Sequence, residues 1–313
     1  MENSLATEKK QQPVLPKVRK KKPNKEVLWA YLFIAPTVLG LFVFYMFPAI
    51  ASFALSFTKW NGISTAEYVG LENIITLLND ESFIRSVLNT IVFTIVSVPL
   101  SVIFALIISL LLNQRIKGMV MYRTLYFLPV VTMPVAVGMV WKWLYNTEYG
   151  LINYMLGSLG LPQPSWLFDP NISLISVILV YVWMTVGNNV ILLLAGLQGI
   201  DKTYYEAAQI DGASKMKQFF NITLPLITPT LFFVFITGMI SSLQVFDLIY
   251  IMIGESTALL DPLRTVVFGV YETGFEYSQM GMASAQAFLL FLAILAVTII
   301  QFVFQKKWVH YDG

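Results

Sequence analysis

Residues 204–229 read YYEAAQIDGASKMKQFFNITLPLITP, a polar stretch between two long apolar runs. Alanine is the best helix former, so residues 205–209 are compatible with a helical turn. Gly212 adopts a positive φ at no steric cost, which lets it end this helix and reverse the chain. Pro225 and Pro229 lack N–H donors and favour a helix start or a kink. The stretch therefore predicts a helix, a turn and a second helix.

The second helix of this stretch has an apolar side. Met216, Phe219 and Phe220 fall at i, i+3 and i+4 and form one apolar stripe, while the polar side chains between them can face water. Ala207 and Ala208 in the first helix have almost no side chain, so another protein can approach their backbone closely. The alternative interpretation of this pattern is an amphipathic connector that lies on a membrane surface.

Composition indicates a membrane protein. The chain has 313 residues, of which 57% are hydrophobic and only 12% are charged, and its mean hydropathy is +0.70. A soluble domain carries about 25% charged residues. Continuous apolar runs of about 20 residues indicate helices rather than a β-barrel. The sequence therefore predicts an all-α polytopic membrane protein.

Six transmembrane helices are predicted. They cover about residues 28–57, 87–112, 125–145, 172–197, 226–253 and 283–304. Pro129 and Pro134 are expected to bend the third. Ala49-Ile50-Ala51 resembles a signal-peptidase site, but the apolar run before it is longer than a signal peptide requires, so we expect an uncleaved span.

The charged residues set the expected domain limits and orientation. Residues 1–26 are predicted to be a disordered basic arm, residues 27–308 the six-helix domain, and residues 309–313 a tail. Of the 20 Lys and Arg residues, all except Lys59, Arg85, Lys142 and Arg264 lie in the arm, in the 113–123 loop, in the 199–225 loop or at Lys306 and Lys307 near the C-terminus. The positive-inside rule then places both termini and the 199–225 loop in the cytoplasm. We interpret the basic arm as this topology signal and expect no nucleic-acid partner.

Several kinds of chemistry are excluded by residue usage. The chain contains no cysteine, which rules out disulfides, thiol nucleophiles and cysteine metal sites. Its one histidine is His310, so neither a histidine relay nor a histidine metal cluster is possible. No catalytic Ser-His-Asp set is present, and no Gly-x-x-x-x-Gly-Lys-Ser/Thr phosphate loop occurs. The sequence thus predicts no enzyme, no catalytic residue, no metal site and no cofactor of its own.

The 199–225 loop also resembles a known motif. Glu206-Ala207-Ala208, three residues, Gly212, nine residues and Ile222-x-Leu224-Pro225 resemble the signature loop of the permease subunits of binding-protein-dependent ABC importers. Leu197-Gln198-Gly199-Ile200 and the run 245–250 (VFDLIY) resemble the carbohydrate branch of that family, the maltose and glycerol-phosphate permease type. The resemblance covers roughly residues 29–308. One departure is Ile253-Gly254-Glu255-Ser256, where this branch often has Gly-Gly-Pro.

The resemblance implies partners and a mechanism. It implies a second homologous permease subunit, two ATP-binding subunits that hold ATP and Mg, an extracellular solute-binding protein and a sugar substrate, assembled in a bacterial or archaeal inner membrane. We name residues 199–225 the coupling loop, because in that family the loop forms the coupling helix that docks on the ATPase. The residues expected to couple to the ATPase are Tyr205, Glu206, Ala207, Ala208, Asp211, Gly212, Ala213, Leu224 and Pro225.

Polar side chains inside the fourth and fifth spans suggest a substrate path, because such groups are costly unless they face a cavity or another helix. The candidates on the two spans are Tyr181, Thr185, Asn188 and Asn189, and Thr237, Ser241, Gln244 and Asp247 at i, i+4, i+7 and i+10. Hydroxyls, amides and aromatic rings suit a neutral sugar. Hydrogen bonding between packed helices is the alternative role for each.

Asp247 leaves a second function open. An acidic residue within a span is also what an ion-coupled secondary transporter of a small polar solute would use. However, such a carrier typically has inverted repeats, and we find no convincing internal repeat in the sequence. We therefore favour a structural or gating role for Asp247 and keep the carrier as the alternative function.

Overall fold

The computed structural model describes residues 25–114, 118–253 and 260–309. The chain divides into two compact units, residues 1–51 and 52–313. α1 (Lys25–Leu41) lies in the first unit and continues through a π-turn, η1 (Phe42–Met46), into α2 (Phe47–Leu55), whose last residues belong to the second unit. The N–H of Phe47 bonds to the carbonyl of Phe42, and this wider turn ends immediately before Pro48, which has no N–H to donate. The first predicted span is thus one long helix.

The ends of the chain differ slightly from the prediction. Lys25 and Glu26 belong to α1 rather than to the predicted arm, whose remaining residues 1–24 lie outside the described residues. Val309 follows the last helix, and the rest of the predicted tail, which includes His310, also lies outside them.

The second unit is almost entirely helical. Among its described residues two short strands, β1 and β2, pair antiparallel, with Thr58 opposite Tyr68. Its elements in chain order are β1 (Thr58–Lys59), β2 (Glu67–Tyr68), α3 (Glu72–Asn79), α4 (Glu81–Leu112), α5 (Met119–Val131), α6 (Pro134–Leu144), α7 (Leu151–Ser158), α8 (Ser173–Gln198), α9 (Lys202–Ile210), α10 (Lys215–Gln218), the π-turn η2 (Phe219–Thr223), α11 (Leu224–Leu243), α12 (Asp247–Ile253), α13 (Leu260–Leu263), α14 (Val266–Tyr271), the π-turn η4 (Glu272–Glu276) and α15 (Met280–Trp308).

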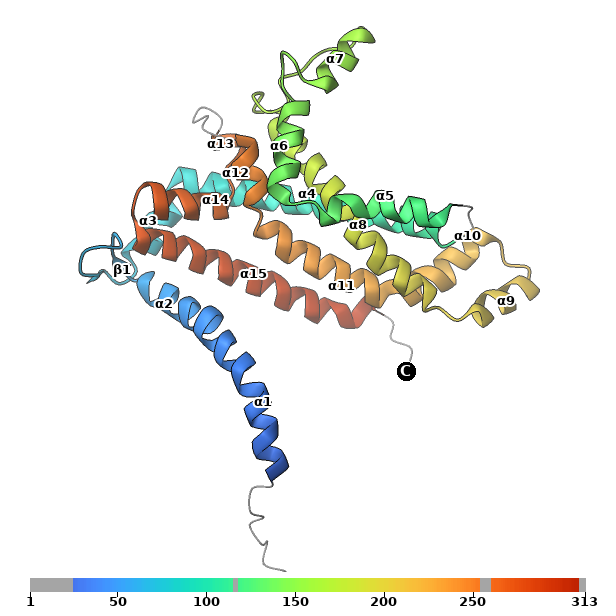
Figure 1. Cartoon of the computed structure of the whole chain (residues 1–313), viewed down its shortest axis with the longest axis horizontal. Coiled ribbons are helices and arrows are strands. Elements are labelled where there is room, and N and C mark those ends of the chain that lie inside the picture. The colour runs from blue at the N-terminus through green and yellow to red at the C-terminus, as the bar shows by residue number, and fades with distance from the viewer. Residues whose placement is uncertain (1–24, 115–117, 254–259, 310–313) are drawn as a thin grey trace, which may run out of the picture. The chain divides into compact units, whose positions relative to one another are not determined.

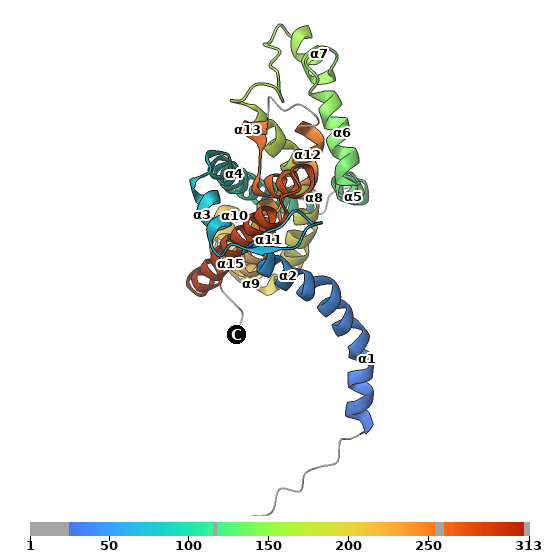
Figure 2. The same ribbon diagram turned by 90° about the vertical axis from the view of Figure 1, so that its left-hand side faces the viewer.

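The long helices α4, α8 and α11 form the centre of this unit. α4 packs along α8, α11 contacts both, α5 lies on α8, and α15 packs against α11 and α14 (Figures 1 and 2). Phe93, Val177, Leu193 and Ile227 are fully buried between them. At Gly187 the backbone of α5 approaches so closely that a Cβ would overlap the carbonyl oxygen of Tyr126. Small residues allow such close contacts between helices.

The structure confirms the expected membrane-spanning architecture. Five helices of the described chain are long and apolar enough to cross a membrane, and α5 with α6 adds a sixth if the bent pair counts as one span. The axes of α5 and α6 are bent by 105° at the break between them. This bend is sharper than the one predicted from Pro129 and Pro134. Thr132 and Met133 are extended at the break, because the residue before Pro134 avoids helical backbone angles.

The fifth span also differs from the prediction of one helix over residues 226–253. A continuous helix begins earlier, at Lys215, and it ends at Leu243. Its π-turn η2 closes with a bond from Leu224 N–H to the Phe219 carbonyl, directly before Pro225. Beyond Leu243 the chain turns and starts the separate helix α12. The Thr265 hydroxyl donates to the Val245 carbonyl across 3.2 Å and so satisfies a backbone group within this break.

Candidate functional site

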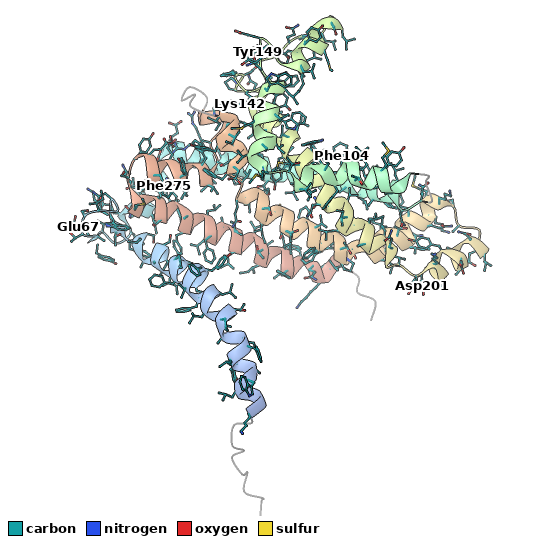
Figure 3. All side chains as sticks on the ribbon, in the orientation of Figure 1. Glu67, Phe104, Lys142, Tyr149, Asp201 and Phe275 are labelled. Carbon is teal, nitrogen blue, oxygen red and sulfur yellow. The ribbon has the colours of Figure 1, made fainter. Side chains whose placement is uncertain are left out.

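The coupling loop begins with a well-capped helix, α9. The Asp201 side chain accepts a hydrogen bond of 2.9 Å from the Thr203 N–H. This bond and a further one from the Thr203 side chain hold the pKa of Asp201 below its usual value. Because the carboxylate stays charged and lies at the positive end of the helix dipole, it stabilises the start of α9. Asp201 lies at one end of the second unit, and Glu67 and Phe275 lie at the other (Figure 3).

The turn after α9 is a Schellman motif. The Gly212 N–H bonds to the Gln209 carbonyl at 3.1 Å, and the Ala213 N–H bonds to the Ala208 carbonyl at 2.9 Å. Gly212 has φ +73°, the left-handed conformation that this motif requires. The predicted turn at Gly212 is therefore present. A Cβ at position 212 would have no neighbouring atom within 4 Å, so a side chain there would not clash. Glycine is favoured only because of the positive φ.

The chain then folds back and starts the helix that continues as α11. Ser214 caps α10, and the Gln218 amide donates to the Ala213 carbonyl at 2.9 Å. The Tyr205 hydroxyl lies 2.9 Å from Thr223 Oγ1 in η2. These contacts join α9 to the beginning of the fifth spanning helix.

The outer surface of the coupling loop is exposed and partly apolar. Glu206 and Ala207 are exposed, whereas Ala208 is half-buried. Ile210 is 87% exposed and Met216 67% exposed. Met216 and Phe220 of the apolar stripe are therefore exposed, whereas Phe219 is half-buried. The structure gathers the predicted residues from Tyr205 to Ala213 here, and it places Leu224 and Pro225 further on, at the first turn of α11.

A polar cavity of about 240 Å³ lies between α4, the α5–α6 break, α8 and α11. Six of the predicted path residues line it. They are Tyr181, Thr185, Asn188, Asn189, Thr237 and Ser241. Sequence reasoning missed Ser101 and Thr132, which also line it. The helical spacing of serines and threonines on α4, and a threonine between two prolines, were the available signals.

Gln244 and Asp247 do not belong to the lining that the described residues form. The prediction placed them on one helical face with Thr237 and Ser241. This prediction is wrong because α11 ends at Leu243, Gln244 caps it with non-helical backbone angles, and Asp247 begins α12. The break changes the direction of the chain, so the helical spacing no longer holds. Asp247 is exposed in the first turn of α12.

Some cavity residues hold helices together. The Asn189 amide donates to Ser101 Oγ at 2.9 Å, and Ser101 Oγ lies 3.0 Å from Thr185 Oγ1. These bonds tie α8 to α4. The Tyr181 ring packs edge-on against Phe93, with the ring centroids 5.0 Å apart.

Other cavity residues are available to a solute. Asn188 and Ser241 are exposed. Thr237 donates to the Phe233 carbonyl of its own helix at 2.8 Å, which leaves oxygen lone pairs able to accept a hydrogen bond. Within the described residues the lining contains no Lys, Arg, Asp or Glu. Nor does the described part of the chain contain a group of three His, Cys, Asp or Glu side chains that could hold a metal ion.

Known proteins resemble this chain over most of its length. It is 34% identical to a probable ABC transporter permease protein, YesP, of Bacillus subtilis, with 93% of this chain and 94% of that one covered. It is 31% identical to the sn-glycerol-3-phosphate transport system permease protein UgpA of Agrobacterium fabrum, with 92% and 98% covered. It is 34% identical to the trehalose/maltose transport system permease protein MalF of Thermococcus litoralis, with 88% and 93% covered.

A solved structure has the same fold. A chain of a bacterial alginate ABC transporter, crystallised in complex with an alginate pentasaccharide-bound periplasmic protein, superimposes with a TM-score of 0.82 at 22% identity, covering 90% of this chain and 96% of that one. The family model of the binding-protein-dependent transport system inner membrane component matches residues 70–310. This chain therefore belongs to the family of inner membrane permease components of binding-protein-dependent ABC transport systems.

Proposed function

We propose that this chain is the transmembrane subunit of an ATP-driven importer and couples to a separate ATPase through the coupling loop. The observation that carries this proposal is the Schellman turn at Gly212, which presents α9 as an exposed helix joined to the fifth spanning helix. Exposed Glu206, Ala207 and Ile210 provide a surface on which a partner can dock. Two ATPase subunits would engage two such loops, so a second permease subunit is required.

The transported solute is proposed to be a neutral sugar or oligosaccharide. The polar cavity offers hydroxyl and amide groups and the Tyr181 side chain, and its described lining carries no charged side chain. A sugar presents hydroxyls for hydrogen bonds and a CH face for aromatic contact. Glycerol phosphate and alginate, named for two of the similar proteins, are anionic and would call for a cationic group. The trehalose and maltose named for a third are neutral.

The delivery route and orientation follow from the same proposal. An extracellular solute-binding protein would hand the sugar to the outer loops, and both termini and the coupling loop would face the cytoplasm, where ATP is available. ATP and Mg would be held by the ATPase. An ion-coupled carrier would need a titratable group in the path, but Asp247 is outside the cavity lining.

Co-purification tests the coupling proposal. The chain is solubilised gently from its native membrane and pulled down as wild type, Gly212→Val and Gly212→Asn. Asparagine tolerates the left-handed conformation, whereas a β-branched side chain does not. We expect an ATPase and a second permease with wild type and with Gly212→Asn, and loss of the ATPase with Gly212→Val.

Two results would contradict the proposal. One is a wild-type chain that purifies alone, and the other is an ATPase that binds all three forms equally. Uptake into vesicles that depends on an ion gradient rather than on ATP would instead support the carrier.

A further inference from the structure

The span formed by α5 and α6 is sharply bent at a break, and the predicted fifth span is interrupted after Leu243. The helices that follow these two breaks, α6 and α12, pack together. α6 follows the break at Thr132–Met133, α12 follows the break after Leu243, and the two helices lie side by side (Figure 1). A Cβ on Gly138 of α6 would lie 3.0 Å from Ile251 Cγ2 and 3.6 Å from Leu248 Cδ1. The absence of a side chain at Gly138 thus allows α6 to approach α12 closely.

A contact with a charged side chain joins the C-terminal ends of α6 and α12. Lys142 Nζ donates a hydrogen bond of 3.1 Å to the carbonyl oxygen of Ile251. Ile251 lies in the last turn of α12, where carbonyl groups have no intrahelical donor and the helix dipole is negative. Lys142 therefore caps the C-terminal end of α12 from a neighbouring helix.

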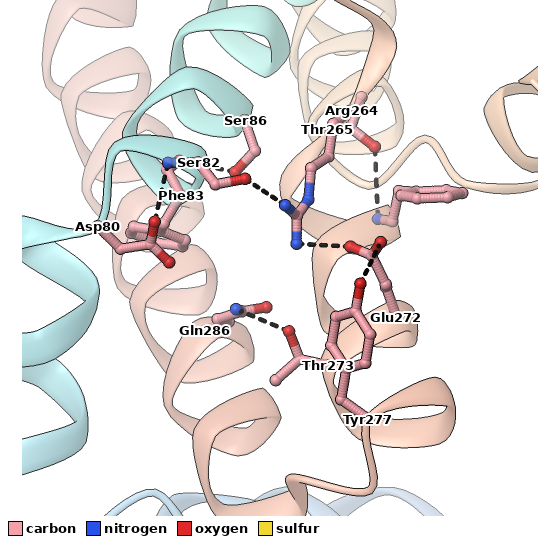
Figure 4. Close-up of polar contacts among 11 residues, drawn as sticks. Asp80, Ser82, Phe83, Ser86, Arg264, Thr265, Glu272, Thr273, Tyr277 and Gln286 are labelled. Carbon is pink, nitrogen blue, oxygen red and sulfur yellow. Dashed lines mark hydrogen bonds and ion pairs between the residues drawn. The ribbon is translucent and has the colours of Figure 1, made fainter. Parts of the chain in front are cut away.

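The residues just before α12 are connected to α4 instead, through the segment 264–266. The Thr265 hydroxyl donates a hydrogen bond to the Val245 carbonyl. The next residue, Val266, donates its N–H to Thr90 Oγ1 of α4 at 3.0 Å. Arg264, which precedes Thr265, forms a buried ion pair of 2.6 Å with Glu272 and a hydrogen bond with Ser82 of α4 (Figure 4).

The two ends of α12 therefore have different attachments. The N-terminal end is connected to α4 through Thr265 and Val266, and the C-terminal end is bonded to Lys142 of α6. The cavity lies where α6 begins, since Thr132 and Pro134 line it, and Ser241 lines it just before the second break.

We propose that Lys142 is a positioning residue that joins α6 and α12 into one body, which turns about the two breaks and opens or closes the outer side of the polar cavity. This inference rests on the proposed transport function. The Lys142–Ile251 bond makes the two detached helices move together, so that each cycle changes the cavity at both breaks at once.

The absence of native cysteine allows a direct test by cross-linking. A Cβ on Gly138 would lie 3.3 Å from Ile251 Cβ, just below the range of about 3.5–4.5 Å found in disulfides, so a small shift of one helix would allow the bond. We expect Lys142→Met to lower ATP-driven uptake roughly threefold to tenfold, as for the loss of one hydrogen bond to a charged group at an exposed site, with an unchanged melting temperature. Lys142→Arg should retain most of the uptake.

The rescue experiment distinguishes this role from a general packing role. In the Lys142→Met/Gly138→Cys/Ile251→Cys variant, oxidation should restore uptake because the disulfide replaces the bond, and reduction should remove it again. In Gly138→Cys/Ile251→Cys with Lys142 intact, the oxidised protein should still transport. Failure of the rescue, or loss of uptake when the intact-Lys142 variant is oxidised, would overturn the proposal.

A readout that does not depend on uptake separates this inference from the proposed function. Ser241→Cys is labelled with a membrane-impermeant maleimide added outside, and Lys142→Met should change the labelling rate at least threefold. An unchanged rate would contradict the coupled movement. Absence of any ATP-dependent uptake by the wild-type complex would instead contradict the proposed function, and the labelling comparison would still be valid.

Discussion

The Tyr205 hydroxyl oxygen lies 2.9 Å from Thr223 Oγ1, so one hydrogen bond joins α9 of the coupling loop to the start of the fifth spanning helix. The backbone turn at Gly212, the Ser214 cap of α10 and the Gln218–Ala213 bond also brace this fold-back. We therefore expect a displacement of α9 to be passed to α11 through this short and partly buried contact.

We expect Tyr205→Phe to weaken coupling while leaving the helix intact. Loss of one neutral hydrogen bond costs about 0.5–1.5 kcal/mol, which corresponds to a twofold to tenfold fall in uptake per ATP hydrolysed. Thr223→Val should have a similar effect, and the double variant should be no worse than either alone. The ratio of uptake to ATPase activity in proteoliposomes measures this, and additive effects would argue against the bond.

Asn188 and Asn189 are neighbours with different expected roles. Asn188 is exposed toward the polar cavity, whereas Asn189 is buried and bonds to Ser101. Asn188→Ala should raise the KM for uptake at an unchanged melting temperature. Asn189→Ala should destabilise the protein by about 1–3 kcal/mol, because it leaves the Ser101 contact unmade. Thermal melting and uptake kinetics on both variants check this pair, and the reverse pattern would exclude the assignment.

The Arg264–Glu272 ion pair is buried, since the two side chains are only 17% and 5% exposed. Glu272→Gln leaves the guanidinium uncompensated and should destabilise the protein by about 3–5 kcal/mol, while the paired change Arg264→Met/Glu272→Leu should recover much of the loss. The Glu81–Arg85 pair, also 2.6 Å apart but well exposed, is the matched control. Glu81→Gln should leave the melting temperature unchanged, because water already screens that pair. Equal melting temperatures for Glu272→Gln and wild type would refute this account.

Gly187 is required where α5 crosses α8. A methyl group there would overlap the Tyr126 carbonyl oxygen, so Gly187→Ala must push the two helices apart. We expect a loss of about 1–3 kcal/mol, typical of overpacking. Gly199→Ala is the control, because the nearest atom to its Cβ would be at an ordinary 3.4 Å. Comparable melting temperatures for the two variants would show that α5 can shift without cost.

Local chemistry made the coupling loop predictable from the sequence. The left-handed turn at Gly212, the capped helix before it and the re-entry at Pro225 each depend on backbone preferences of a few neighbouring residues. The spanning helices were predictable because each needs only a long apolar run. A break such as the one at Pro134 was visible as a bend, but its angle of 105° was not, since it depends on what each half packs against.

What the sequence by itself determined is therefore the class of fold, the approximate spans and the turn of the coupling loop. Only the tertiary structure decided that Gln244 and Asp247 leave the helical face of Thr237 and Ser241, that Asn189 bonds to Ser101 and that Lys142 caps α12. The physical reason is the separation along the sequence of the residues that interact. Helix and turn formation depend on residues within a few positions, whereas these contacts join residues 88 and 109 positions apart, which no periodicity along the chain can encode.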